Sequence, residues 1–289
     1  MLIPRFWSKY ESQVQLPNGK KAGVACWRAS ETSAAEAQAL ARAAGERFAE
    51  RIRRGEDFPG PYPYGDRPLR EEVLEDIPGP AGDVAAVLTR NGYGTVVLNT
   101  ARVLFIDVDL PAAGAQFAPL RRLAHALLPF LVAPPRDPVI QALARLKEWL
   151  AARSGWGVRV YRTRAGLRYL VTHSTFEPGS GESEAAMAFL ACDPAYVRLC
   201  KVQKSFRARL SPKPWRCGIE RPVWRFPAEN AAGEEVIREW VERYESASRG
   251  YATCELLASL GREPIHPEVM EVVRLHDASA RVGSGLPLA

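Results

Sequence analysis

The stretch VLFIDVDL places Asp107 and Asp109 one residue apart in an otherwise apolar run. Side chains alternate between the two faces of a β-strand, so both carboxylates are expected to point the same way. Two unpaired carboxylates on a buried strand repel each other and are costly to remove from water. A bound Mg²⁺ or Mn²⁺ removes that repulsion, because these hard cations prefer oxygen ligands. In the alternative, one aspartate pairs with an arginine and the other caps a turn.

A second candidate is the segment VYRTRAGLRYLV, which has the pattern of two strands joined by a turn at Gly166. Arg164 lies at the turn, and Arg168 lies at the start of the returning strand. Turn amides and guanidinium groups bind phosphate oxygens. The segment therefore predicts a phosphate contact, with a solvent-exposed basic hairpin as the alternative.

The third candidate is DPAYVRLCKVQKSFRARLSPKPWR, in which one aspartate and seven basic residues are interleaved with aromatic side chains. Basic groups alternating with aromatics suit a phosphate backbone with stackable bases. This pattern predicts a nucleic-acid contact at Arg198, Lys201 and Lys204. The spacing of Arg207 and Arg209 places both on one face of a strand.

The order of these motifs resembles the catalytic core of the archaeo-eukaryotic primase superfamily. FIDVD matches the first family motif, and Asp193 matches the acidic residue of the third. The resemblance implies that Asp107, Asp109 and Asp193 hold metal ions. It also places Arg209, Ser211 and Lys213, in RARLSPK, near an incoming triphosphate. The middle motif departs from the family, because Arg168 stands where the family has a nucleotide-binding histidine.

The apolar patterns predict the elements that must position these residues. Strands are expected over 21–29, 84–89, 95–99, 101–110 and the hairpin 157–173, with 195–210 extended or mixed. A first helix, capped by Ser30 or Ser33, is expected to end at Gly55, and further helices are expected over 69–77, 117–131, 138–153, 182–191, 233–248 and 268–278, with an irregular loop over 58–68. This order predicts an α+β fold with a mixed, largely antiparallel central sheet and flanking helices. The resemblance implies a primase-polymerase-like two-part α/β core.

Three regions are expected: an N-terminal α/β region with a Pro/Tyr-rich loop (1–80), a catalytic-like core (81–225) and a C-terminal helical region (226–289). The net charge of +6 is concentrated in the core, since residues 153–225 hold 14 Lys and Arg against five Asp and Glu. A basic block of this kind indicates polyanionic partners, with a solvated positive surface as the alternative.

We therefore expect a metal-dependent nucleotidyltransferase, with Mg or Mn as cofactor and a nucleoside triphosphate and DNA or RNA as partners. The alternatives are a non-catalytic nucleic-acid-binding protein on a diverged primase-like scaffold, or a metal-dependent phosphate-ester hydrolase. Five scattered cysteines without zinc spacing favour reduced thiols and a cytoplasmic location. The sequence has no apolar run long enough for a membrane span, and it leaves the oligomeric state open.

Overall fold

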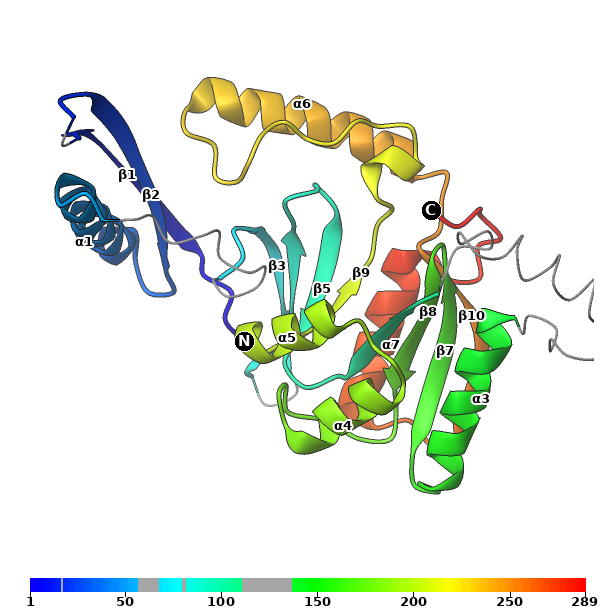
Figure 1. Ribbon diagram of the computed structural model, residues 1–289. Helices are drawn as coiled ribbons and strands as arrows, with labels where there is room; N and C mark the ends of the chain where they lie inside the picture. Colours follow the sequence, from blue (N-terminus) through cyan, green and yellow to red (C-terminus); the bar gives the residue numbers. More distant parts are fainter. Residues whose placement is uncertain (17, 57–67, 80–81, 111–136) are drawn as a thin grey trace, which may run out of the picture.

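The computed structural model describes residues 1–16, 18–56, 68–79, 82–110 and 137–289. It has an α+β fold with antiparallel sheets, as the sequence predicts, and Figure 1 shows the arrangement of its elements. The irregular loop expected over 58–68 falls almost wholly outside the described residues, and the helix expected over 117–131 lies outside them altogether.

A small N-terminal unit stands beside the rest of the chain (Figure 1). Strands β1 (Phe6–Gln15) and β2 (Lys21–Ser30) form a hairpin, and α1 (Ala34–Arg53) packs on it. Of the two predicted caps, Ser33 is the one observed, because its side chain accepts a hydrogen bond from the Glu36 amide at 3.1 Å. Val14 and Val24 of the hairpin pack with Ala49 and Ile52 of α1, so the unit has its own small core.

Two four-stranded antiparallel sheets form the body of the molecule. The first has the order β3 (Glu72–Pro78), β4 (Val84–Arg90), β5 (Val96–Thr100) and β9 (Phe206–Arg209). The second has the order β10 (Cys254–Gly261), β7 (Gly157–Thr163), β8 (Gly166–Val171) and β6 (Phe105–Asp109). Strand β6 carries both candidate aspartates, and its neighbour β8 carries Arg168.

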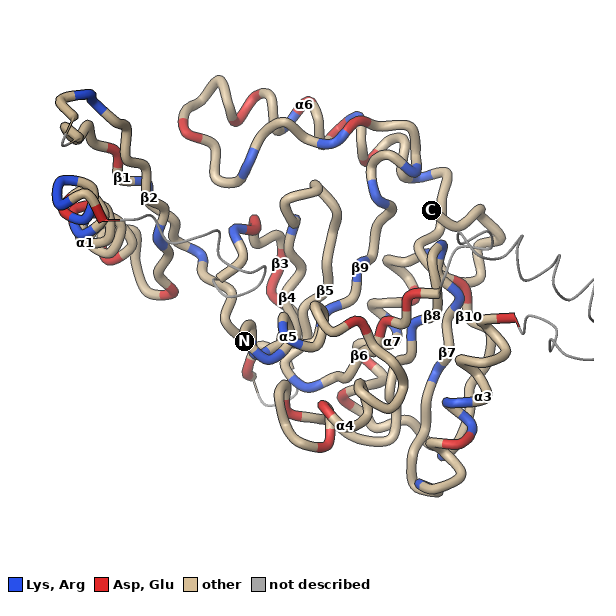
Figure 2. The backbone as a smooth tube through the Cα atoms, viewed as in Figure 1, with Lys and Arg blue, Asp and Glu red and all other residues tan. Residues whose placement is uncertain are grey.

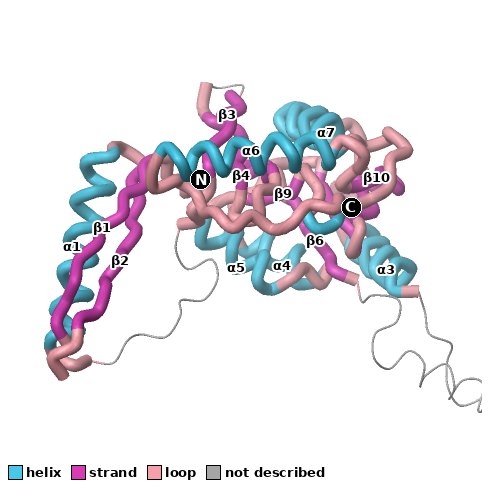
Figure 3. Tube along the Cα trace, turned by 90° about the horizontal axis from the view of Figure 1, so that it is seen from above, coloured by secondary structure: helices cyan, strands magenta, loops and turns pink. Residues whose placement is uncertain are grey.

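Helices cover the sheets on both sides (Figure 3). On one side lie α3 (Pro138–Ala151), α4 (Gly181–Phe189) and α5 (Pro194–Gln203), and on the other lies α7 (Pro267–Ala280). A short 3₁₀ helix, η1 (Pro214–Arg216), and α6 (Ala231–Ser248) follow β9. One large apolar core joins both sheets to α3, α4 and α7.

One expected element is wrong. Residues 69–77 were expected to be helical, but 72–78 form strand β3, which pairs antiparallel with β4. The segment 195–210, expected to be extended or mixed, is mixed: it divides into the helix α5 and the strand β9, with Lys204 in the left-handed region between them. Tertiary pairing overrides the helical propensity of the Glu- and Leu-rich 69–77 segment.

Strand pairing also crosses both expected region boundaries. β3 lies before residue 80 and pairs with β4 of the expected core, while β10 lies after residue 225 and pairs with β7.

Among the helices in the described ranges, none combines the length and apolar character needed to cross a bilayer.

Candidate functional site

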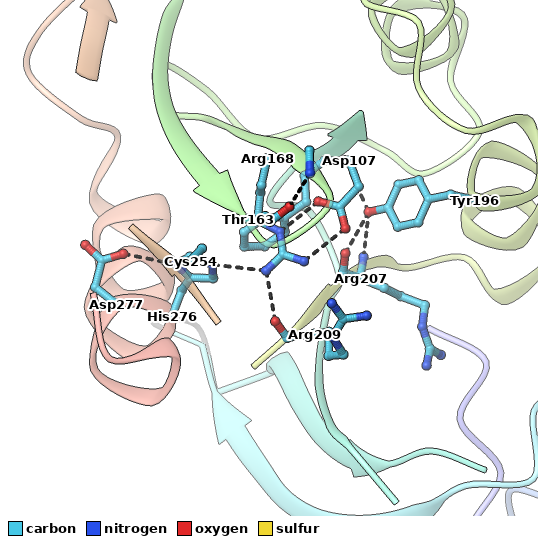
Figure 4. Close-up of polar contacts among 11 residues, drawn as sticks. Asp107, Thr163, Arg168, Tyr196, Arg207, Arg209, Cys254, His276 and Asp277 are labelled. Atoms are coloured by element: carbon cyan, nitrogen blue, oxygen red, sulfur yellow. Dashed lines mark hydrogen bonds and ion pairs between the residues drawn. The ribbon is translucent and has the colours of Figure 1, made fainter. Parts of the chain in front are cut away.

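Asp107 and Arg168 face each other across the β6–β8 pair and form a two-bond ion pair (Figure 4). The Arg168 Nε and Nη2 atoms donate to the two carboxylate oxygens of Asp107 at 2.7 and 2.9 Å. Burial opposes the Arg168 charge, but the Asp107 carboxylate more than offsets this and raises the pKa of the guanidinium. Arg168 thus points toward Asp107, and the first part of the alternative, in which one aspartate pairs with an arginine, is observed.

The remaining nitrogen of Arg168 is also engaged. Nη1 donates to the Arg209 carbonyl oxygen at 3.0 Å and lies 3.3 Å from His276 Nε2. With 2% of its surface exposed, Arg168 organises the interior of the site and is not presented to a ligand.

Asp193 caps a helix. Its side chain accepts a hydrogen bond from the Ala195 amide at 2.9 Å, and Pro194 occupies the first turn of α5. Asp109, by contrast, is exposed at the end of β6. Within the described ranges, no three His, Cys, Asp or Glu side chains come together in a group able to hold a metal ion. The three-aspartate ligand set is therefore not assembled in this arrangement, and Mg or Mn binding stays a prediction.

Several expected phosphate contacts are engaged within the fold. Arg207 is buried and donates to both oxygens of Glu71, at 2.7 and 2.9 Å. Ser211 Oγ accepts from the Val96 amide at 2.8 Å and lies 2.6 Å from the Tyr244 hydroxyl. Both residues connect β9 and its extension to neighbouring segments, so neither is free to bind a ligand.

Four basic residues gather around the exposed end of β6, and we name them the basic cluster: Arg164, Arg209, Lys213 and Arg216. Burial and the charge of Arg168 lower the pKa of Arg209 to about 10. Burial also lowers the pKa of Lys213, and the charges of Arg209 and Arg216 lower it further, with Asp109 acting in the opposite direction. Figure 2 shows Lys and Arg positions spaced along β9 and the segment that follows it.

The positive charge of the basic cluster is only partly offset by the nearby carboxylates of Asp107 and Asp109. Arg209 Nε and Arg216 Nη1 are buried and have no hydrogen-bond partner among the described residues. In the part of the chain that the structure describes, neither Asp109 nor any residue of the cluster forms an ion pair. Unpaired buried charge is costly, so this arrangement favours an anionic ligand.

Arg198, Lys201 and Lys204, the expected nucleic-acid contacts, are exposed on α5 and at its C-terminal end. Lys201 forms an ion pair with Glu184 of α4 at 2.8 Å. The helical spacing of Arg198 and Lys201 places them on one face, which replaces the expected extended track.

Sequence reasoning missed Arg216 and His276. Arg216 belongs to the basic segment after β9, where its charge was visible but its position was not. His276 lies on α7, more than 100 residues from Arg168, and the sequence gives no local signal for this contact.

No family model, curated protein or solved structure matches this chain.

Proposed function

We propose that this chain binds the phosphate groups of a nucleotide or nucleic-acid strand at the basic cluster. The observation that carries the proposal is the part-buried Arg209, whose Nε has no partner and whose neighbours include Arg168, Lys213 and Arg216. Charge-assisted hydrogen bonds from guanidinium groups to phosphate are strong and directional, and a phosphate would supply the missing acceptors.

The balance of charge supports a phosphorylated ligand. The five cationic side chains are the basic cluster and Arg168, and the two nearby carboxylates are Asp107 and Asp109. Because Arg168 already neutralises Asp107, the cluster keeps most of its positive charge. A polyphosphate or phosphodiester satisfies that charge without a metal ion.

The donor set does not fit the metal centre that the primase resemblance implies. Asp107 gives both oxygens to Arg168, and Asp193 gives an oxygen to the start of α5. We therefore derive no nucleotidyl-transfer step through a metal, and phosphate binding itself is the proposed activity.

The test is the affinity of a fluorescent nucleoside triphosphate for Arg209→Met, measured in EDTA. Loss of one or two charge-assisted bonds of about 1.5–3 kcal/mol should weaken binding about ten- to hundred-fold or more. Thermal stability should stay equal or rise, because methionine removes a buried unpaired charge. The matched control is Lys147→Met on α3, an exposed lysine away from the cluster, which should change neither quantity.

Wild-type affinity in Arg209→Met would refute the proposal. Binding that occurs only with Mn²⁺, and is lost in Asp109→Asn, would instead favour the metal-dependent transfer expected from sequence.

A further inference from the structure

A cleft of about 1050 Å³ lies between the N-terminal hairpin, the β4–β5 turn and the segment before α6. Its wall includes three aromatic side chains from separate segments, Trp7, Trp27 and Tyr93, and three arginines, Arg28, Arg70 and Arg225. We name it the aromatic–arginine cleft. It is large for a mononucleotide, since small-molecule sites usually occupy about 300–1,000 Å³.

The hairpin presents its two tryptophans on one face. Trp7 pairs with Ala29 and Lys9 pairs with Trp27, so Trp7 and Trp27 are diagonal neighbours on the same side. Trp7 is oriented by a hydrogen bond from its Nε1 to the Pro4 carbonyl oxygen at 3.2 Å. Arg70 lies over the Trp27 ring, 4.5 Å from its centroid. The cleft therefore offers flat aromatic faces with guanidinium groups beside them.

The carboxylates at the cleft are engaged elsewhere. Glu71 lines the wall but binds Arg207, and Glu229, whose charge acts on Arg70, pairs with Lys9 at 2.7 Å. Burial lowers the pKa of Arg70, and the charge of Arg225 lowers it further. Among the described residues, Arg70 and Arg225 form no ion pair, so the cleft is both aromatic and positively charged.

An exposed chain of aromatic and basic side chains connects this cleft to the basic cluster. Lys213 lies 5.5 Å from the Trp215 ring centroid, and Arg221 lies 4.3 Å from the same centroid. Trp215 meets Tyr93 edge-to-face at 5.6 Å, and Arg221 also lies 5.8 Å from the Tyr93 ring. Tyr93 and Trp215 are 46% and 39% exposed, which leaves both rings accessible to a ligand.

We propose that the aromatic–arginine cleft binds the bases of single-stranded nucleic acid, whose backbone continues past Trp215 to the basic cluster. This inference rests on the proposed function, because it assigns the ligand of the same basic cluster. Bases stack on aromatic rings only when they are unpaired, whereas a duplex hides its base faces. The alternation of rings and cations fits a strand of unpaired bases and phosphates better than a duplex.

The experiment measures the affinity of labelled 12-nucleotide DNA and RNA strands, and of the matching duplex, by fluorescence anisotropy. The variants are Tyr93→Ala, in an exposed turn, and Trp27→Ala. Each should weaken single-strand binding about five- to hundred-fold, from one lost stacking contact. Each should leave the affinity for a fluorescent nucleoside triphosphate within about two-fold. Phe189→Ala on α4, which removes a ring 39% exposed, is the control and should change neither.

Arg70→Gln provides an independent variant if Trp27→Ala does not fold, and it should also weaken single-strand binding. If Tyr93→Ala and Arg70→Gln bind single strands as the wild type does, while Arg209→Met loses triphosphate affinity, the cleft does not bind bases. The proposed function would then remain intact. Equal affinity of wild type for duplex and single strands would also overturn base binding in the cleft. Failure of Arg209→Met to affect the triphosphate would instead count against the proposed function. The DNA and RNA arms identify which strand is preferred.

Discussion

The environment of Arg168 fixes the protonation of its neighbours. An arginine only donates hydrogen bonds, so His276 Nε2, 3.3 Å from Nη1, must be the acceptor. The proton of the neutral imidazole is then on Nδ1, which lies 3.0 Å from Asp277 Oδ1. Burial lowers the pKa of His276, and the Arg168 charge acts in the same direction. Asp107, Arg168, His276 and Asp277 thus form one continuous polar network that also contacts the Arg209 backbone (Figure 4).

Asp107→Asn should therefore destabilise the protein, because it leaves a buried guanidinium opposite a neutral amide. Breaking a buried pair costs about 3–5 kcal/mol, and we expect the lower end because the Asp107 side chain is 35% exposed. Urea denaturation measures this change. The double variant Asp107→Leu with Arg168→Met should recover much of the loss, since it removes both charges.

A stabilised Asp107→Asn would contradict this prediction. It would mean that relief of repulsion between Asp107 and Asp109 outweighs the loss of the ion pair. From sequence alone, the sign of this effect was open, because the partner of Asp107 was unknown.

At the scale of the elements, the pairing of β6 with β8 depends on Gly166, which lies opposite Asp109. A Cβ atom at Gly166 would lie 2.0 Å from the Val108 carbonyl oxygen, a backbone atom with no rotamer to change. Gly166→Ala should separate the ends of the two strands, lower stability by roughly 1–3 kcal/mol and displace Asp109 and the cluster. Thermal unfolding and triphosphate affinity measure the two effects.

Gly155→Ala is the matched control, because no atom lies within 4 Å of the added Cβ and its backbone φ is not positive. It should leave stability unchanged or slightly raised. If Gly166→Ala were as stable as Gly155→Ala, the ends of β6 and β8 would accommodate the added Cβ atom without loss of stability, and the prediction would be wrong.

The Asp-Pro pairs show how far the sequence predicts the elements. Asp137-Pro138 precedes an apolar helical pattern, and α3 begins there as expected. Asp193-Pro194 has the same cap-and-proline chemistry and begins α5, but the motif resemblance directed attention to Asp193 as a metal ligand. The same local signal was therefore present at Asp193-Pro194, but no helix was predicted to begin there.

Other elements had weaker local signals. β10 alternates buried and exposed residues but is an edge strand more than 80 residues from its partner β7, and no turn joins them. β1 is largely polar and gains its stability from β2 and α1. The strands with strong apolar patterns, β4 to β8, were predictable, whereas strands defined by long-range pairing were not.

At the scale of the whole molecule, the charge pattern predicts an electrostatic partner, and the fold divides that charge into two surfaces. One surface is the basic cluster with the aromatic–arginine cleft, whose arginines form no ion pair among the described residues. The other is α5, where Lys201 is partly compensated by Glu184. The sequence indicated that both surfaces carry basic residues. Only the three-dimensional arrangement shows which of those residues form ion pairs with nearby carboxylates.

Salt dependence distinguishes the two surfaces. For single strands, the slope of log K against log salt changes by about 0.7 for each phosphate contact. Replacing Arg70 and Arg225 with glutamine should therefore flatten the slope by about 1.4, since two contacts are lost. Charge reversal at Arg198, Lys201 and Lys204 should change it less, because those residues lie on α5, outside the cleft wall. Anisotropy titrations between 50 and about 200 mM salt measure both slopes. A larger flattening in the α5 variant would place the strand along α5, as the sequence pattern first indicated, and a slope near zero in wild type would remove nucleic acid as a partner.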